Sequence, residues 1–363
     1  MMDIINTDKL PDGCTSIQQS NGIIKNIAPN GSEWTDKLYD DTYICLTPKN
    51  MCVHLNNINI VNKIYNRYNY FDNNPFGFIG DYDLVDSNTN YHLNKIGKSN
   101  VDYMHGKYGI SPVIGCSHGC VYCYMKDIAL KFKNHKDING EQIFNTYTDW
   151  CKPIMVSNYW ELVYGLIDHL HKTNNHDDVM LSFSTDPFQY KYPEVITRSL
   201  QTIELLNRNN IPCRILTKGI LPACLINYSK SNKYGITLIT MNDNFRKQLE
   251  PHASSIYNRI GALRYLHDNG CYTWVSIEPF LPIEFYNNDE NLFFSALNEI
   301  LYNINFVNEI IFGGLCVHNV SNSMYNNDIN KRLYKEAADI IRRFCESTDK
   351  KFWIRKDTGN NNF

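Results

Sequence analysis

The sequence predicts an α/β fold, a partial (β/α)6 barrel of parallel strands with an N-terminal extension, on the strength of three observations. Six short runs rich in β-branched residues recur from about residue 108 onward. Longer segments with helical periodicity lie between them, and strands that alternate with helices are typical of parallel sheets. One more run, FWIRK (352–356), follows the last unit and is the candidate for a final strand.

The six candidate strands are short apolar runs separated by longer polar or amphipathic segments. In chain order they are ISPVIG (110–115), VMLSFS (179–184), CRILTK (213–218), GITLIT (235–240), CYTWVSI (271–277) and EIIFGG (309–314). In a barrel of this TIM-like kind, the loops after the carboxyl ends of the strands carry the chemistry. Those loops are therefore where functional residues are expected.

Two segments of the barrel region have the apolar spacing of an amphipathic helix. Residues 193–208 are the first, and residues 328–346 the second. The apolar positions that fall on one face are Ile196, Leu200, Ile203 and Leu206 in the first, and Ile329, Leu333, Ala337, Ile340, Ile341 and Phe344 in the second. Both faces are expected to pack against the sheet.

The N-terminal part of the chain has a different texture from the barrel region. It mixes short apolar runs with turn-forming residues, a pattern that predicts only weak strands and loops. We therefore divide the chain into an N-terminal extension of unassigned role (1–105) and a barrel with a C-terminal helix and strand (106–363).

The composition limits the classes of function. With 43% hydrophobic residues, 20% charged residues and a net charge of -3, the chain is that of an ordinary globular protein without a general affinity for polyanions. Its start has no signal peptide pattern, and no apolar stretch is long enough to cross a bilayer. Most of the 12 cysteines are scattered, several of them in apolar runs, which favours a reducing, cytoplasmic location. Because no apolar span is long enough, no membrane association is expected.

Three cysteines are not scattered but lie together in GCSHGCVYC, directly after the first candidate strand. The spacing of Cys116, Cys120 and Cys123 lets three thiolates surround one metal centre, and the two glycines of the loop allow the tight backbone this needs. A cubane iron–sulfur cluster held by three thiolates leaves one iron open to a ligand with oxygen or nitrogen donors. A structural zinc with a fourth ligand, or three buried free cysteines, are the alternatives.

The stretch CSHGCVYC is a CxxxCxxC motif with Tyr122 directly before the third cysteine, and it resembles the signature loop of the radical S-adenosylmethionine (SAM) superfamily. The resemblance implies a [4Fe-4S] cluster on the three cysteines, with SAM chelated to the open iron through its amino and carboxylate groups. It also implies an electron donor such as flavodoxin or ferredoxin. The implied reaction is reductive cleavage of SAM to a 5′-deoxyadenosyl radical that abstracts hydrogen from a substrate.

Further stretches resemble the spore photoproduct lyase-like subgroup of that superfamily in order and spacing. They are LSFSTDPFQ (181–189), ILTKG (215–219) and VSIEPFLP (275–282), and the resemblance covers roughly residues 108–320. By position it implies contacts to the SAM amino group at the end of the second strand, to the SAM carboxylate at the end of the third, and near the carboxylate or ribose at the end of the fourth. The residues so implied are Ser184, Thr185 and Asp186, then Lys218, then Thr240, with Tyr122 and Glu278 also counted as cofactor-binding.

Two of these groups have a structural alternative that the residues themselves suggest. Lys218 ends an apolar strand, so its ammonium either binds a carboxylate at the mouth of the barrel or extends to solvent. Residues 184–187 (STDP) match a helix N-cap and turn, a role that is compatible with ligand binding.

The candidates on the fifth and sixth strands have alternatives as well. Glu278 either binds a hydroxyl of SAM or of the substrate, or pairs with a basic residue. Gly313 and Gly314 either let the backbone approach a ligand closely or form an ordinary strand-to-loop turn. His118 is expected to hydrogen-bond within its loop rather than to bind metal.

The resemblance weakens at one position of the second strand. The lyase that repairs the spore thymine dimer has a hydrogen-donating cysteine just before its serine and aspartate, whereas this chain has Phe183 or a neighbour there and no cysteine in LSFSTDPFQ. That particular repair reaction is therefore not predicted.

Three hypotheses for the function stay open. The first is a radical SAM enzyme of nucleic-acid repair or modification, motivated by the subgroup and by KIYNRYNYF (63–71). The rings of that stretch either stack on bases or belong to a tyrosine-rich core strand or helix, which the mildly acidic net charge favours. The second is a radical SAM enzyme that acts on a peptide, a protein side chain or a small metabolite. The third is a non-catalytic metal-binding protein.

Overall fold

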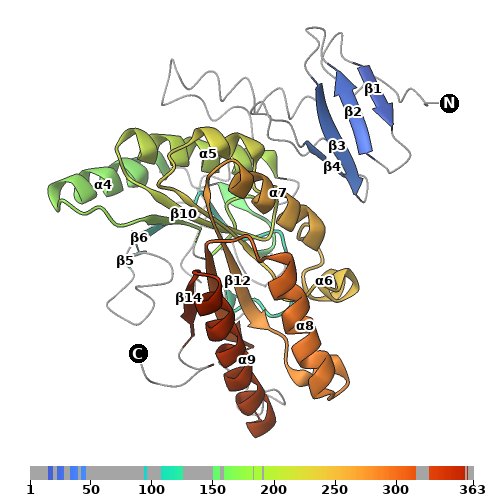
Figure 1. The fold of residues 1–363 in the computed structure, drawn as a ribbon. Coiled ribbons are helices and arrows are strands. Elements are labelled where there is room, and N and C mark those ends of the chain that lie inside the picture. The colour runs from blue at the N-terminus through green and yellow to red at the C-terminus, as the bar shows by residue number, and fades with distance from the viewer. Residues whose placement is uncertain are drawn as a thin grey trace.

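A computed structural model gives the fold of the chain (Figure 1). It describes residues 15–18, 23–27, 33–39, 42–45, 94–95, 108–125, 150–155, 159–182, 184–189, 192–315, 327–355 and 358. Phe183 and the stretch 63–71 lie outside these residues, so the interpretations placed on them stay predictions.

An eight-stranded sheet organises the described part of the barrel region (Figure 1). Its order is β14-β13-β12-β11-β10-β9-β6-β5, in which every neighbouring pair is parallel except β5 with β6. The bounds are β5 Asn94–Lys95, β6 Tyr108–Ile110, β9 Val179–Leu181, β10 Cys213–Thr217, β11 Lys233–Thr237, β12 Tyr272–Phe280, β13 Glu309–Gly314 and β14 Lys351–Ile354. Because β14 and β5 stand at opposite edges, the partial barrel is confirmed, with the final strand in place.

The first predicted strand is wrong in extent. Residues 110–115 are split between β6 and a separate strand β7 (Val113–Ile114), which pairs antiparallel with β8 (Ile154–Met155). Pro112 lies between them, and because proline has no N–H it cannot continue the ladder of the main sheet. The cysteines therefore follow the short β7–β8 pair rather than a strand of the barrel.

Two further strand ends differ from the prediction. The second strand stops at Leu181 because Ser182 has a positive φ of 65°, which an extended strand does not tolerate. The fourth strand runs from Lys233 to Thr237 instead of 235–240, so Thr240 lies three residues beyond its end.

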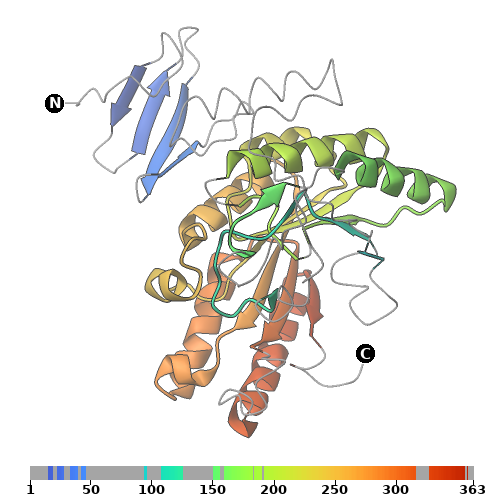
Figure 2. The same ribbon diagram turned by 180° about the vertical axis from the view of Figure 1, so that it is seen from behind.

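The helices surround the outer face of the sheet (Figures 1 and 2). The long ones are α4 (Tyr159–Lys172), α5 (Pro193–Arg208), α7 (Ile256–Asp268), α8 (Glu290–Asn303) and α9 (Asp328–Ser347), with short α6 (Asp243–Leu249) and 3-10 helices η2 (Ala223–Asn227) and η3 (Ile283–Tyr286). Helices α5 and α9 confirm the two that the apolar spacing predicted.

One residue of α9 that was predicted on the buried face, Ile329, lies on the exposed face. Ile329 is 53% exposed, whereas Leu333 and Ile341 of the same predicted face are fully buried. Its neighbour Asn330 takes the inward position in the first turn, where it accepts a hydrogen bond from the Ile283 amide at 3.0 Å. The first turn of this helix therefore makes a polar contact to η3, which the apolar period does not reveal.

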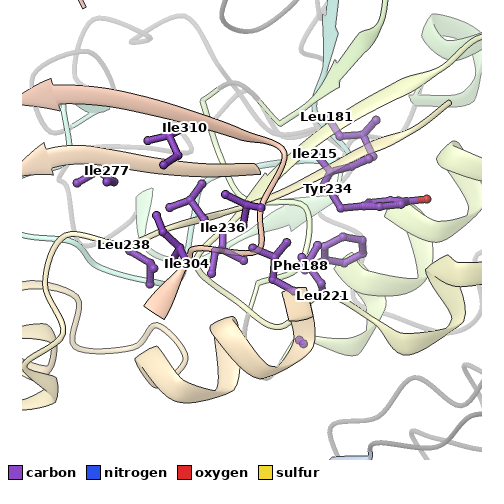
Figure 3. Packing of buried hydrophobic residues seen from close by; sticks show 14 of the residues in the cluster. Leu181, Phe188, Ile215, Leu221, Tyr234, Ile236, Leu238, Ile277, Ile304 and Ile310 are labelled. Carbon is purple, nitrogen blue, oxygen red and sulfur yellow. The ribbon is translucent and has the colours of Figure 1, made fainter. Parts of the chain in front are cut away.

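Side chains of the strands alternate between two separate apolar regions. Those that point outward meet the helices in the main core, which includes Ile215, Ile236, Ile277 and Ile310 on the strands drawn in Figure 3. The intervening positions face the inside of the barrel, where Trp274 and Ile311 form a cluster with Leu216 and Trp353. The sheet is thus covered on its outer face by helices and filled on its inner face by its own large side chains.

The predicted extension contains a four-stranded antiparallel sheet. Its strands are β1 (Thr15–Gln18), β2 (Ile23–Ile27), β3 (Glu33–Tyr39) and β4 (Thr42–Cys45), paired in chain order. Strand β5 also precedes residue 105 but belongs to the barrel sheet. The boundary between extension and barrel stays a prediction.

Among the described helices, none combines the length and the apolar character that a membrane crossing requires. The predicted cytoplasmic location is not tested further by the fold.

Candidate functional site

The site is built around residues 115–123, here called the cysteine loop, which follows β7. Gly115 and Gly119 both have positive φ, at 86° and 63°. A side chain on Gly115 would also lie 2.5 Å from the carbonyl oxygen of Trp150. The Cys116 amide donates to that same oxygen at 2.9 Å, so glycine is required where the loop is held against the strand-β8 segment.

The three cysteines of the loop differ in exposure. Cys120 is buried, whereas Cys116 and Cys123 are partly exposed, and the Cys123 amide donates to the Cys120 carbonyl at 3.1 Å. Burial, and then the charge of Asp186, raises the pKa of the Cys116 thiol well above its usual value. Burial raises the pKa of Cys120 to about 12, although the nearby Lys218 opposes this. Metal ligation by these thiols would therefore release protons.

Within the described residues, no group of three or more Cys, His, Asp and Glu side chains could hold a single metal ion. A cubane cluster binds each thiolate through a different iron, so it suits sulfur atoms that are spread further apart than the ligands of one zinc ion.

The segment after β9 hydrogen-bonds to the backbone of the cysteine loop. Gln189 is fully buried, and its side chain accepts from the Ser117 amide at 2.7 Å and donates to the Gly115 carbonyl at 3.1 Å. The Thr185 hydroxyl also donates to the Gly115 carbonyl and accepts from Gln189 at 3.0 Å. Ser184, beside them, is partly exposed. The predicted trio of residues 184–186 is thus brought next to the cysteines.

Asp186 joins three parts of the site. Its carboxylate accepts from the Thr217 hydroxyl at 2.6 Å and from the Lys218 amide at 2.7 Å, and it lies 3.4 Å from Nδ1 of His118. Burial alone would raise the pKa of Asp186, but the charge and hydrogen bond of His118, with the other two bonds, hold it below its ordinary value. The carboxylate therefore stays ionised and links the second strand's loop, the end of β10 and the cysteine loop.

Lys218 follows β10 directly, at the edge where the parallel strands end. Its Nζ lies 5.8 Å from the centre of the Tyr122 ring. Burial lowers the pKa of Lys218, but the charges of Cys120, Glu250 and Asp186 outweigh this and hold the pKa above its ordinary value. The site therefore keeps a positive charge beside the cysteine loop at neutral pH.

A third segment contacts the cysteine loop from α6 toward α7. The Tyr122 hydroxyl donates to Oε1 of Glu250, and Arg259 of α7 donates to Oε2 at 2.5 Å. Neither charged residue has any exposed surface. Sequence reasoning missed both, and it missed Gln189 although this residue ends a stretch that it singled out; the Glu250–Arg259 pair has no spacing that signals function.

Two predicted cofactor-binding residues have protein partners elsewhere. The Thr240 hydroxyl accepts from the Asn242 amide at 3.0 Å, in the turn that precedes α6. Glu278 accepts from the Ser276 hydroxyl at 3.1 Å and pairs with Arg355 at 3.6 Å. The basic partner that the sequence left open for Glu278 is therefore Arg355, and the roles of both residues toward SAM stay predictions.

The expectation that Gly313 and Gly314 let the backbone approach a ligand is corrected by their surroundings. A Cβ atom on Gly313 would lie 2.5 Å from Oε1 of Glu278. One on Gly314 would lie 2.6 Å from the ring of Tyr334. Protein side chains fill both spaces, so close packing within the fold explains the two glycines.

The central part of the chain is similar to known proteins. Residues 110–292, half of the chain, match the model of the radical SAM superfamily. An uncharacterised protein of Methanocaldococcus jannaschii is 23% identical over 184 residues, which make up 48% of this chain and 61% of that protein. The chain therefore spans less than two thirds of that relative.

Solved structures of spore photoproduct lyase are similar in fold. A mutant with bound AdoMet and dinucleoside spore photoproduct has a TM-score of 0.53 and 12% identity, over 81% of this chain and 94% of that chain. A complex with dinucleoside spore photoproduct has a TM-score of 0.52 and 12% identity, over 83% and 95%. At such identity, the similarity is one of fold.

Proposed function

This chain belongs to the radical SAM superfamily, and from that premise we propose that Cys116, Cys120 and Cys123 hold a [4Fe-4S] cluster at which SAM is bound and cleaved. Membership makes the protein a radical SAM enzyme and implies both cofactors. The observation that carries the residue assignment is the three thiols on one loop with the Lys218 ammonium beside them.

The residues present fit these cofactors. Three thiols in a loop with two positive-φ glycines are the donor set that an iron–sulfur cluster with one open iron requires. The Ser117 hydroxyl in the same loop is buried without a hydrogen-bond partner among the described residues. A loop with three thiols and a buried hydroxyl that has no partner among the described residues suits a bound group.

When bound, the cluster and SAM supply a reductive cleavage that generates the 5′-deoxyadenosyl radical for hydrogen abstraction. Lys218 would offer a point charge to the carboxylate of SAM, and Ser184 and Thr185 would offer hydroxyl oxygen atoms to its amino group. Asp186 connects the loop after β9 to the end of β10, through the Lys218 amide, and to the cysteine loop, through His118. Thr240, Glu278 and Tyr122 complete the proposed set.

The test is anaerobic reconstitution with iron and sulfide, followed by reduction with SAM and chromatography for 5′-deoxyadenosine. Replacement of Cys116, Cys120 or Cys123 by alanine should abolish the cluster and the product while the barrel stays folded. Cys213→Ala is the matched control, because Cys213 is a buried cysteine of β10 outside the cysteine loop. Product formation that survives loss of a loop cysteine would contradict the assignment.

For the substrate we propose a nucleic acid, to be tested before other classes. The support is the fold shared with spore photoproduct lyase, whose structures contain a dinucleoside. Thymine dimer repair itself is not proposed, because LSFSTDPFQ lacks the cysteine that would return the hydrogen. Retention on single-stranded and duplex nucleic acid should fall steeply with added salt. No binding at low salt would favour a peptide or metabolite substrate instead.

A further inference from the structure

Glu250 is a buried carboxylate beside the cysteine loop for which the proposed function has no role. It is fully buried and accepts from the Tyr122 hydroxyl through Oε1 and from Arg259 through Oε2, at 2.5 Å in the second case. A buried carboxylate is costly unless it is paired and hydrogen-bonded. Both of its oxygen atoms therefore have a fixed direction, one toward the loop and one toward α7.

Arg259 fixes the far side of this contact. Its guanidinium also donates to the carbonyl oxygen of Thr237, at the end of β11, at 3.0 Å. Two further bonds reach the carbonyl oxygen of Ser254, at 3.0 and 2.8 Å. Because the planar fork of arginine binds several acceptors in one geometry, it ties Glu250 to the rigid sheet.

The backbone from Leu249 to Ser255, here called the connector, also contacts the cysteine loop on one side and the end of β10 on the other. The Val121 amide donates to the Leu249 carbonyl at 2.9 Å, and the His252 amide donates to the His118 carbonyl at 3.2 Å. On its other side, the Ser254 amide donates to the carbonyl oxygen of Lys218 at 3.0 Å. The connector therefore bridges the cysteine loop and the residue that ends the third barrel strand.

The side chain of Lys218 also contacts the cysteine loop, through Tyr122. Its Nζ stands over the ring of Tyr122, the residue whose hydroxyl Glu250 holds. Glu250 carries the negative charge that balances Lys218 and Arg259 in this region. One carboxylate thus faces both parts that the proposed function requires, the cysteine loop and the SAM-binding lysine.

We propose that Glu250 is a positioning residue that, through Tyr122, Arg259 and the connector, fixes the placement of the cysteine loop relative to the Lys218 ammonium. This inference rests on the proposed function, because the purpose of that placement is to let one SAM molecule meet the cluster and the lysine together. Glu250 itself touches neither cofactor in this role.

The chain offers a matched control for a merely structural carboxylate. Glu309, at the start of β13, is 8% exposed and accepts from Arg214 at 2.7 Å and from the Tyr272 hydroxyl at 3.1 Å. It therefore has the same kinds of partner as Glu250. It lies at the opposite ends of the barrel strands, away from the cysteine loop.

The experiment compares Glu250→Gln and Tyr122→Phe with Glu309→Gln and Tyr272→Phe in the full chain. The first readout is amide hydrogen exchange of residues 115–123 in the cluster-free protein. The second is the SAM dissociation constant of the reconstituted protein by equilibrium dialysis, together with iron content and the electron paramagnetic resonance spectrum of the reduced cluster with SAM.

The first pair should exchange the loop amides faster and lose about tenfold in SAM affinity, equal to about 1.4 kcal/mol, with a changed spectrum and near-normal iron content. The control pair should lower the unfolding temperature and leave the other readouts unchanged. If Glu250→Gln does not fold, amide exchange of the cluster-free Tyr122→Phe protein decides, because this variant deletes the hydroxyl that Glu250 binds and the readout involves no SAM.

Unchanged loop exchange and SAM affinity in the first pair would overturn the inference, as would an equal loss of affinity in Glu309→Gln. Failure of the proposed function has a different signature, in which the wild-type protein binds no SAM at all. Wild-type binding with unaltered variants is failure of the Glu250 inference alone.

Discussion

Lys218 is the residue whose charge distinguishes the proposed site from an ordinary loop cluster. We expect Lys218→Ala to retain the cluster and to lose about 1.5 to 3 kcal/mol of SAM binding free energy, the range for a hydrogen bond to a charged group. Equilibrium dialysis of the reconstituted protein measures this. Lys233→Ala is the control, because Lys233 lies at the other end of the neighbouring strand, where it pairs with Asp178 at 2.5 Å. Wild-type SAM affinity in Lys218→Ala would show that the assignment is wrong.

The lowered pKa of Asp186 leads us to expect that its contribution to the stability of the fold depends on pH. Its pKa lies below the ordinary 3.8, so its ionised form stabilises the fold above that value, and the contribution is lost as the pH falls through the folded-state pKa. Asp186→Asn should therefore be less stable than wild type at pH 7, by on the order of 2 kcal/mol. The difference should shrink as the pH falls below about 4.

Thermal unfolding from pH 7 to pH 3 measures that difference. Asp168→Asn is the control, because the partner that Asp168 has among the described residues is the exposed Lys172 of the same helix, α4. Its stability should follow wild type throughout. A difference for Asp186→Asn that stays constant across the range would contradict the assigned ionisation.

At the scale of elements, packing inside the barrel depends on a glycine in β11. A Cβ atom on Gly235 would lie 2.3 Å from the indole of Trp274 on β12. Gly235→Ala should therefore cost about 1 to 3 kcal/mol of unfolding free energy, as overpacked cores do. In contrast, Gly261→Ala on α7 meets nothing within 4 Å and should stabilise by about 0.5 to 1 kcal/mol. Denaturant unfolding measures the unfolding free energy of both variants. Equal changes in the two would contradict the prediction that the Trp274 indole leaves no room for a side chain at Gly235.

The elements also show what local pattern reveals and where it stops. Helix α5 was predicted over its full length, because its apolar period is continuous and Pro193 stands at its start. The first strand was predicted as one run, because apolar residues flank Pro112 on both sides and only the sheet shows the break. Ile329 was placed inside the core, because nothing local reveals that Asn330 bonds to η3.

At the scale of the whole molecule, cofactor binding should be visible as global stability. A ligand that binds the folded state alone stabilises it by about 2.7 kcal/mol at 100 times its dissociation constant. We expect SAM to raise the unfolding temperature of the reconstituted protein measured anaerobically, and to have no effect on Cys116→Ala. A shift of equal size in that variant would mean that SAM binds without the cluster.

Local pattern was enough to predict the repeated βα units, the parallel barrel and the family, because apolar periods and the CxxxCxxC spacing lie within short stretches of chain. It also indicated the residues that end the second and third strands as neighbours of the cysteines. In the structure, the Thr185 hydroxyl donates to the Gly115 carbonyl, and the roles of these residues toward SAM stay predictions.

The distant residues that support the cysteine loop became known from the three-dimensional fold. Tyr122 and Glu250 are separated by 128 positions, and Gln189 reaches the Ser117 amide across 72. Such contacts depend on how strands, helices and the connector pack together in space. No periodicity or motif records them, because a buried carboxylate looks the same in a sequence whether it faces the core, an arginine or the loop of a cofactor.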